Sequence, residues 1–276
     1  MIAYNKVKIP DLILGTYKHN QYSLLKNIVL SSIENGITGF DTAPSYGTEK
    51  ILGKIIHECL NKLQKSRKDL FISTKIDAFQ MQDSNGNVEC YVDKVLKEMK
   101  LDYIDQLLIH WPITEYFNKT WESFIRIYKS GQAKVIGVCN VRKRHILKLM
   151  NSELFPMVVQ NERHPIYIDQ MTLEFCKKNK IIYEAYSPVG QMMKRIDNSN
   201  TLQKLALKYD RSIGQIIIRW HIDTGSIPVF MTSKKERLKE YSSVFNFSLN
   251  TEDIASIDAL NENYKIFLES EGCPNF

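Results

Sequence analysis

The feature that most constrains the fold of this chain is an alternation of short apolar runs with amphipathic stretches along its whole length. The runs predicted as strands are residues 9–15, 37–40, 70–76, 104–109, 135–138, 157–159, 181–185 and 227–230. The predicted helices are residues 22–35, 48–63, 88–99, 121–128, 143–150, 170–177, 201–209, 213–222, 234–241 and 251–260. Almost continuously apolar strands are typical of a parallel sheet covered on both faces. Because crossovers through helices are right-handed, eight such units close into a ring. We therefore predict an α/β fold: a (β/α)8 TIM barrel, a parallel eight-stranded barrel with surrounding helices.

The length of 276 residues suits one such barrel, and no linker or break in composition divides it, so residues 1–276 are expected to form a single domain. The net charge of +6 can favour anionic ligands, but the basic residues are spread out. Since no helix-turn-helix or zinc-finger spacing appears, no nucleic-acid partner is expected. The five cysteines are odd in number and contain no C-x-x-C, which predicts neither a disulfide framework nor a metal site. Without a signal-peptide core or a membrane-length apolar run, we expect a cytoplasmic protein with no membrane partner.

The stretch from residue 39 to residue 47 is the first candidate site. A strand ends on Asp41, and a short loop containing Pro44 then delivers Tyr46. Active sites of alternating strand–helix folds lie at the carboxyl ends of strands. A capping aspartate followed by a packed tyrosine would explain these residues equally well. The residues at the ends of the other strands distinguish between the two interpretations.

Polar groups follow five further strands. The third strand ends at Lys75, the fourth at His110, the fifth at Cys139 and Asn140, the sixth at Gln160, and the seventh at Tyr186 and Ser187. A single lysine or histidine in such a place is usually a satisfied polar cap. Because a barrel brings all of these positions to one rim, their coincidence predicts an active site there.

The chemistry of this set is specific. Tyr46 can act as a general acid, but a free phenol with a pKa of about 10 is a poor one at neutral pH. An ammonium group at Lys75 would lower that pKa, and Asp41 would be the partner of the ammonium. His110 can hold a carbonyl oxygen near the phenol. No side chain of the set is an obvious nucleophile, so the expected attacking species is a hydride from a bound cofactor.

Taken together, these motifs resemble the aldo-keto reductase family over nearly the whole chain. The residues that carry the resemblance are Gly15-Thr16-Tyr17, Phe40-Asp41-Thr42-Ala43 with Tyr46-Gly47, Ser73-Thr74-Lys75, Ile109-His110-Trp111-Pro112, Gly137-Val138-Cys139-Asn140, Gln160 with His164-Pro165, and Ala185-Tyr186-Ser187-Pro188. The resemblance implies a barrel that reduces aldehydes or ketones with a nicotinamide cofactor, usually NADPH. It also implies a catalytic tetrad of Asp41, Tyr46, Lys75 and His110 with Tyr46 as proton donor, in a protein that is usually a monomer.

Cofactor contacts follow from the same resemblance. Asn140 and Gln160 match side chains that hold the nicotinamide carboxamide, with Cys139 beside them. Tyr186 matches the aromatic residue that stacks on the nicotinamide ring, and Ser187 matches a pyrophosphate contact. The remaining matches are Gly15, Thr16 and Asp41 near the nicotinamide ribose, and Thr232, Ser233, Lys234, Arg237 and Glu240 around the adenosine.

The sequence departs from the family pattern at several of these positions. Cys139 stands where serine is usual, which weakens one hydrogen bond to the carboxamide. Val159 stands where asparagine is common, and Tyr241 also replaces an asparagine. Met231 occupies the place of a lysine that often grips the 2′-phosphate. Lys234 and Arg237 nevertheless lie at a predicted helix N-terminus, a natural phosphate site, so NADPH is expected and NADH is possible. Both could otherwise be ordinary solvated helix charges.

The substrate is less constrained. Tyr17, Tyr46, His110 and Trp111 are the expected substrate contacts, with Phe79 as a further candidate. The short tail after Tyr264 suggests an open site for small or medium carbonyl compounds such as sugars or dicarbonyls, by analogy alone.

Two other functions remain open on this evidence. A Schiff-base aldolase on the same barrel would use Lys75 as its nucleophile. A catalytically silent protein could use the same site to bind NADP(H) as a sensor or assembly subunit.

Overall fold

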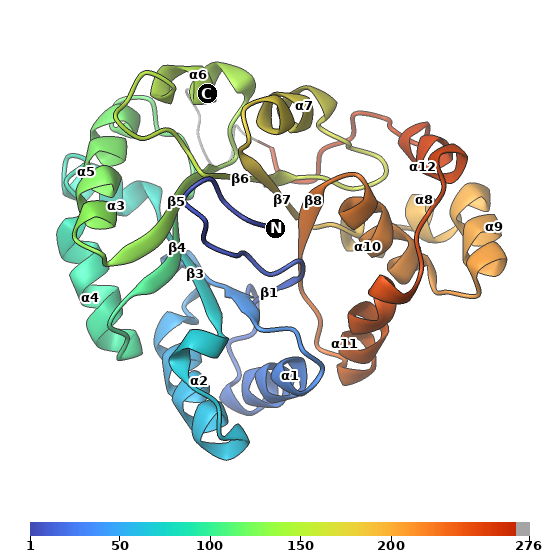
Figure 1. Ribbon diagram of the computed structural model, residues 1–276, viewed down its shortest axis with the longest axis horizontal. Coiled ribbons are helices and arrows are strands. Elements are labelled where there is room, and N and C mark those ends of the chain that lie inside the picture. The colour runs from blue at the N-terminus through green and yellow to red at the C-terminus, as the bar shows by residue number, and fades with distance from the viewer. Residues whose placement is uncertain (269–276) are drawn as a thin grey trace.

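The computed structural model of the protein, described here for residues 1–268, contains eight parallel strands that form one closed barrel (Figure 1). The strands are β1 (Ile13–Gly15), β2 (Gly39–Asp41), β3 (Phe71–Ile76), β4 (Ile104–Ile109), β5 (Ala133–Cys139), β6 (Val158–Glu162), β7 (Ile182–Tyr186) and β8 (Ser226–Phe230). Each pairs with its neighbour in chain order, and β8 pairs with β1. Every predicted apolar run overlaps one strand, so the predicted fold class is confirmed.

Helices surround the strands on the outside of the ring (Figure 1). They are α1 (Tyr22–Glu34), α2 (Glu49–Leu63), α3 (Ala78–Asp83), α4 (Glu89–Met99), α5 (Phe117–Lys129), α6 (Lys143–Leu149), α7 (Gln170–Lys178), α8 (Lys194–Asp197), α9 (Asn200–Tyr209), α10 (Ile213–Asp223), α11 (Lys235–Ser242) and α12 (Thr251–Asp258). Single 3-10 turns are η1 (Pro44–Tyr46), η2 (Arg67–Asp69), η3 (Gly190–Met192) and η4 (Ser243–Asn246). Within residues 1–268, no helix has the length and apolar character needed to cross a membrane.

Three helices differ from the sequence prediction. Short helices α3 and α8 were not predicted, and α5 begins at Phe117 rather than at residue 121. The added first turn of α5 buries Phe117 and Thr120 against the barrel. Helix α3 begins after Asp77, whose side chain forms a capping box with Gln80. Tertiary contacts and a cap, rather than a long apolar periodicity, therefore stabilise these turns.

Five polar residues that were predicted at strand ends lie inside strands: Asp41 in β2, Lys75 in β3, Cys139 in β5, Gln160 in β6 and Tyr186 in β7. Strand β3 ends at Ile76, so Lys75 lies within it, and β6 extends to Glu162, so Gln160 lies within it. The extra residues stay in the sheet because their neighbours continue the ladder: Ile76 pairs with Ile109, and Glu162 pairs with Tyr186. Lys75 and Gln160 therefore have positions fixed by strand pairing rather than by a loop.

Strands β5 and β6 approach each other closely at Gly137. A Cβ atom built on Gly137 would lie 2.4 Å from the carbonyl oxygen of Val158 and 2.8 Å from a methyl group of Leu108. Only glycine fits this position, because a real Cβ does not approach a backbone oxygen so closely. The register two residues later then places Cys139 opposite Gln160.

The N-terminal segment covers one end of the barrel. Residues Ile2 and Lys8 form an antiparallel bridge, and Asn5 Nδ2 donates to the carbonyl oxygen of Lys134 at 2.8 Å, at the start of β5. In Figure 1 this dark blue segment crosses the middle of the ring of strands. Because it covers the end at which the strands begin, the opposite end, where the strands finish, is left for a site.

Candidate active site

A cavity of about 670 Å³ lies where the strands end. The predicted site residues that line it are Gly15, Tyr17, Asp41, Tyr46, His110, Trp111, Asn140, Gln160, Tyr186, Ser187 and Arg237. A second hollow of about 650 Å³ lies at the other end of the barrel, beside the N-terminal segment, and contains none of the predicted site residues. The coincidence of predicted polar residues with the first cavity identifies it as the candidate active site.

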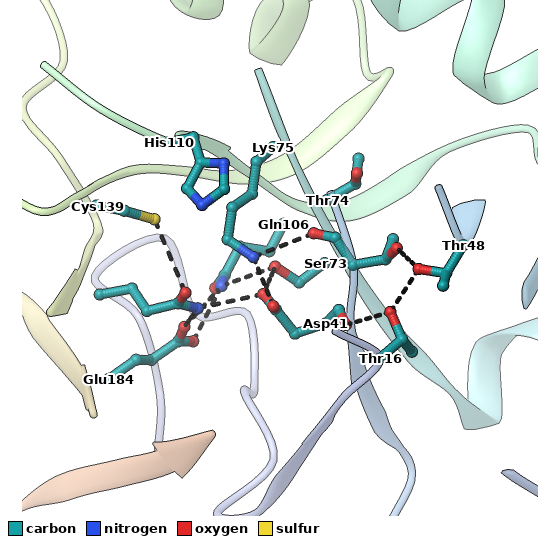
Figure 2. Close-up of polar contacts among 12 residues, drawn as sticks. Thr16, Asp41, Thr48, Ser73, Thr74, Lys75, Gln106, His110, Cys139 and Glu184 are labelled. Atoms are coloured by element: carbon teal, nitrogen blue, oxygen red, sulfur yellow. Dashed lines mark hydrogen bonds and ion pairs between the residues drawn. The ribbon is translucent and has the colours of Figure 1, made fainter. Parts of the chain in front are cut away.

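Asp41 and Lys75 form a buried ion pair beneath this cavity (Figure 2). Lys75 Nζ lies 2.5 Å from Asp41 Oδ1, and both residues are at most 2% exposed. The ammonium also donates to the carbonyl oxygen of Thr42 at 3.0 Å. Burial by itself lowers the pKa of Lys75, but the Asp41 carboxylate outweighs this and raises that pKa above its ordinary value. Lys75 is therefore a fixed positive charge under the cavity.

Tyr46 is brought to this charge by the turn η1. Gly47 ends the turn in the left-handed region at φ 66°, a conformation that glycine adopts without strain. Lys75 Nζ lies 5.0 Å from the centre of the Tyr46 ring. Burial raises the pKa of Tyr46 and the charge of Lys75 lowers it, with burial the larger effect. The expectation of a net lowered pKa was therefore wrong, although Lys75 acts in the expected direction, and the phenol stays protonated at neutral pH.

His110 completes the group with an unpredicted partner, Asp77. The rings of His110 and Tyr46 meet edge to face, with centroids 5.8 Å apart. His110 Nδ1 forms a short hydrogen bond with Asp77 Oδ1, and Asp77 Oδ2 accepts from the backbone N–H of Ser45 at 2.7 Å. Burial raises the pKa of Asp77, but its bonds with His110 and Ser45 outweigh burial and hold that pKa below its usual range. Asp77 thus links the histidine to the turn that carries Tyr46.

Two amide side chains face the cavity from the next strands. Asn140 Nδ2 donates to the carbonyl oxygen of His110 at 2.9 Å, and the hydroxyl of Tyr186 donates to Asn140 Oδ1 at 2.6 Å. Cys139 Sγ lies 3.8 Å from Gln160 Oε1. Asn140, Gln160 and the ring of Tyr186 therefore lie at one wall of the cavity. Such a wall can bind a ligand that carries a carboxamide group on an aromatic ring.

A buried polar network lies below these amides and was not predicted. Gln160 Nε2 donates to Asp41 Oδ2 at 3.2 Å and to Glu184 Oε2 at 2.8 Å. Gln106 Nε2 donates to both oxygens of Glu184 at 3.0 Å and to Ser73 Oγ at 3.2 Å. In Figure 2, Gln106 lies next to the Asp41–Lys75 ion pair and Glu184 lies at the lower left. Burial and the charge of Asp41 raise the pKa of Glu184 to about 7. The sequence did contain a signal, because Gln106 and Glu184 interrupt otherwise apolar strands.

A segment near the end of the described chain forms another wall of the cavity. Phe267 lines the cavity and meets the ring of Tyr186 edge to face at 5.6 Å. The backbone N–H groups of Ile266 and Phe267 donate to the two oxygens of buried Glu162 at 2.6 and 2.9 Å. Sequence reasoning missed this contact because its partners are far apart in the chain.

Several predicted contacts lie away from the cavity surface. These residues are Thr16, Cys139, Thr232, Ser233, Lys234, Glu240 and Phe79. The Thr16 hydroxyl is buried and bonds with the Asp41 carbonyl and Thr48 Oγ1, and Glu240 accepts from Ser212 Oγ at 3.3 Å. Phe79 is 56% exposed on α3. The roles assigned to these residues stay predictions.

The cavity residues suit a nicotinamide dinucleotide. Arg237 reaches the cavity and has no hydrogen bond or ion pair with any residue of the described chain, so its charge is available to an anionic ligand. It shares the cavity with the Tyr186 ring and the Asn140 and Gln160 amides. Met231, at the place of the expected lysine, also lines the cavity.

Comparison with known proteins gives a consistent match. Residues 11–262 match the model of the aldo/keto reductase family. The oxidoreductase YtbE of Bacillus subtilis is 35% identical over 95% of this chain and 93% of its own length. A glyoxal reductase of the same organism is 32% identical over 95% and 93%, and the methylglyoxal reductase DkgA of Escherichia coli is 30% identical over 94% and 92%. A Bombyx mori aldo-keto reductase solved with NADP superposes with a TM-score of 0.91 at 28% identity, covering 98% of this chain and 95% of that one.

Proposed function

The chain belongs to the aldo/keto reductase family and is an NADP(H)-dependent oxidoreductase that reduces carbonyl groups, and from this premise we propose that it reduces small aldehydes or ketones, α-dicarbonyls above all, with Tyr46 as the proton donor. The observation that carries the proposal is the protonated Tyr46 phenol beside the Lys75 charge at the wall of the cavity. The glyoxal and methylglyoxal reductases among its relatives support the substrate class.

NADPH bound in the cavity would supply a hydride to the carbonyl carbon. Tyr46 would transfer its phenolic proton to the carbonyl oxygen as negative charge develops there. Lys75 stabilises the phenolate that remains, because its fixed positive charge lies close to the ring. Asp41 keeps the ammonium in place, and its negative charge balances the positive charge of Lys75 in the resting protein. The raised pKa of Tyr46 suits this role, since the phenol carries its proton throughout the neutral range.

His110 and Asp77 orient the carbonyl oxygen toward Tyr46 in this mechanism. Because Nδ1 of His110 is engaged by Asp77, Nε2 is the ring nitrogen that faces a substrate. Nε2 would then hold the carbonyl oxygen of the substrate by a hydrogen bond. A hydrogen bond to the developing oxyanion lowers the barrier to reduction.

The cofactor would lie along the wall formed by Asn140, Gln160, Tyr186 and Arg237. The two amides would hold the carboxamide, the ring of Tyr186 would stack on the nicotinamide, and Arg237 would bind the 2′-phosphate. If Arg237 reads the 2′-phosphate, Arg237→Ala will lower kcat/KM with NADPH far more than with NADH. An unchanged ratio of the two efficiencies would exclude this role for Arg237.

The environment of Lys75 argues against a Schiff-base aldolase. A nucleophilic lysine needs a lowered pKa, whereas Asp41 raises that of Lys75. The ammonium is 1% exposed and already donates to Asp41 and to the carbonyl oxygen of Thr42. No observation favours a silent sensor over a reductase, because the whole tetrad is assembled at the cavity.

The test is oxidation of NADPH, followed by absorbance, with methylglyoxal, a diketone, an aromatic aldehyde and an aldose. We expect the wild type to turn over methylglyoxal with the highest efficiency and Tyr46→Phe to lose turnover while it still binds NADPH. Activity that persists in Tyr46→Phe would exclude Tyr46 as the proton donor. Binding of NADPH without turnover of any carbonyl by the wild type would favour a sensor instead.

A further inference from the structure

The buried carboxylate of Glu184 has no place in the reaction described above. It is fully buried below the cavity floor and does not line the cavity itself. Its partners are two neutral amides, Gln106 on β4 and Gln160 on β6. A buried acid that is paired with no cation costs folding free energy, so its presence calls for an explanation.

The hydrogen bonds of Gln160 supply one. An ionised carboxylate can only accept hydrogen bonds, so an amide beside it must turn its NH2 group toward it. Gln160 Nε2 donates to two carboxylates at once, those of Asp41 and Glu184. This leaves Oε1 as the atom that Gln160 can offer to the cavity. Oε1 also accepts from the Cys139 thiol at 3.8 Å, but an amide oxygen can accept a second hydrogen bond. Gln106 in turn holds Glu184 by donating to both of its oxygens.

We propose that Glu184, supported by Gln106, is a positioning residue that fixes the amide of Gln160 with its oxygen available to accept a hydrogen bond from the carboxamide NH2 of the nicotinamide ring. The proposal rests on the proposed function, because it takes the cofactor to lie against Gln160. Glu184 acts through Gln160 and does not itself touch the ligand.

The arrangement also makes cofactor binding sensitive to pH. Burial and the charge of Asp41 raise the pKa of Glu184 to about 7, while the bonds from Gln160 and Gln106 and the charge of Lys75 lower it. Cys139 on β5 is a further titratable group near this carboxylate, and burial keeps it a neutral thiol. Glu184 can thus gain or lose a proton near neutral pH.

Protonation of Glu184 would change which end of the Gln160 amide faces Glu184. A protonated Glu184 carries an O–H donor and can bond to Gln160 Oε1, which withdraws that oxygen from the cavity. The network already holds a buried acceptor, Gln106 Oε1, that has no hydrogen-bond partner within the described residues. The hydrogen bonds of this network are therefore incomplete when Glu184 is ionised.

The experiment measures the Kd of NADPH by quenching of protein fluorescence between about pH 6 and 8. We expect wild-type affinity to weaken about 3- to 10-fold toward the acidic end, the worth of one hydrogen bond. Glu184→Gln should show the weak affinity over the whole range, because its neutral amide resembles the protonated acid. Gln106→Leu should move the midpoint to higher pH, because a bond that lowers the pKa of Glu184 is lost.

Two controls separate this role from a general structural one. Glu49 also titrates near neutral pH, because burial raises its pKa to about 7, but it bonds Thr74 and does not line the cavity, so Glu49→Gln should keep the wild-type profile. In a Gln160→Ala background, Glu184→Gln should have no further effect on Kd. The 2′-phosphate of NADPH titrates equally in all variants, so differences between profiles report on the protein.

The outcomes distinguish this inference from the proposed function. A wild type that binds NADPH and reduces carbonyls, with a Glu184→Gln variant of unchanged Kd and unchanged pH profile, would overturn the role of Glu184 alone. A wild type that does not bind NADPH would overturn both. If Glu184→Gln does not fold, an unmoved midpoint in Gln106→Leu overturns the inference in its place.

Discussion

Two carboxylates of the site meet opposite electrostatic surroundings. Asp77 is bonded to His110 and to a backbone N–H, which hold its pKa below the usual range despite burial. Burial and the charge of Asp41 raise the pKa of Glu184 to about 7, because its two amide donors lower that pKa too little to outweigh them. Burial raises the pKa of both acids, and Asp77 is the one whose hydrogen-bond partners outweigh burial.

The charge of Asp77 can be tested with Asp77→Asn. Asparagine caps a helix as well as aspartate does, so α3 should remain intact while the charge next to His110 is removed. We expect kcat to fall about 10- to 100-fold, the value of one charge-assisted hydrogen bond, with the Kd of NADPH unchanged. Single-turnover kinetics and fluorescence titration measure the two quantities separately.

Asp77→Ala serves as the control for the structural part of this role. It removes the cap as well as the charge and should add a loss of about 1 kcal/mol in the free energy of unfolding. Asp77→Asn with wild-type kcat would show that His110 needs no carboxylate.

Among individual residues, the sequence predicts the site residues whose positions follow from the ends of strands alone. Asp41, Lys75 and His110 could be identified because each closes an apolar run. The net pKa of Tyr46 could not, since it depends on the balance of burial against Lys75. Asp77, Gln106 and Glu184 were missed because their partners come from different strands and become visible only with the register.

Strand pairing between β5 and β6 determines the geometry of the cofactor wall. Gly137 lets the two backbones approach, and the same register sets Cys139 opposite Gln160. Short, almost continuous apolar runs made these strands predictable, whereas helix α3 has only six residues and depends on a cap. Elements stabilised mainly by tertiary contacts were therefore the ones that sequence reasoning missed or shortened.

Gly137→Ala tests this dependence on close approach. The added methyl group would meet backbone at 2.4 Å, so the strands must separate, and we expect a loss of about 1–3 kcal/mol in the free energy of unfolding. Because Gln160 moves with β6, NADPH binding should weaken as well. Urea unfolding and fluorescence titration measure both effects.

Gly131→Ala is a useful comparison, since nothing lies within 4 Å of its Cβ position and its cost comes from the backbone at φ 82°. It should destabilise the protein without changing the Kd of NADPH. Equal effects of the two substitutions on NADPH binding would argue against a specific role for the β5–β6 contact.

For the molecule as a whole, the buried acids Glu49 and Glu184 affect how stability depends on pH. Burial raises the pKa of each from 4.5 to about 7, so between these values the folded state binds protons that the unfolded chain has released. Their contribution therefore makes stability fall as pH rises through this window.

We expect Glu184→Gln to be more stable than the wild type at pH above 7, by at most about 3 kcal/mol, the equivalent of its pKa shift. Glu49→Gln should show a smaller gain, because Glu49 is partly exposed. The measurement is urea unfolding of the wild type and both variants across the window. Variants that keep the full wild-type slope would contradict the assignment.

The pairing of β1 with β8 has a consequence for protein synthesis. Ile13 pairs with Val229, so a nascent chain on the ribosome carries an unpaired β1 edge until almost the whole barrel has been translated. Until β8 pairs with β1, the barrel around the Asp41–Lys75 ion pair is not closed. A prematurely terminated chain would therefore be an open, adhesive sheet that needs chaperones or proteolysis, rather than a weak reductase.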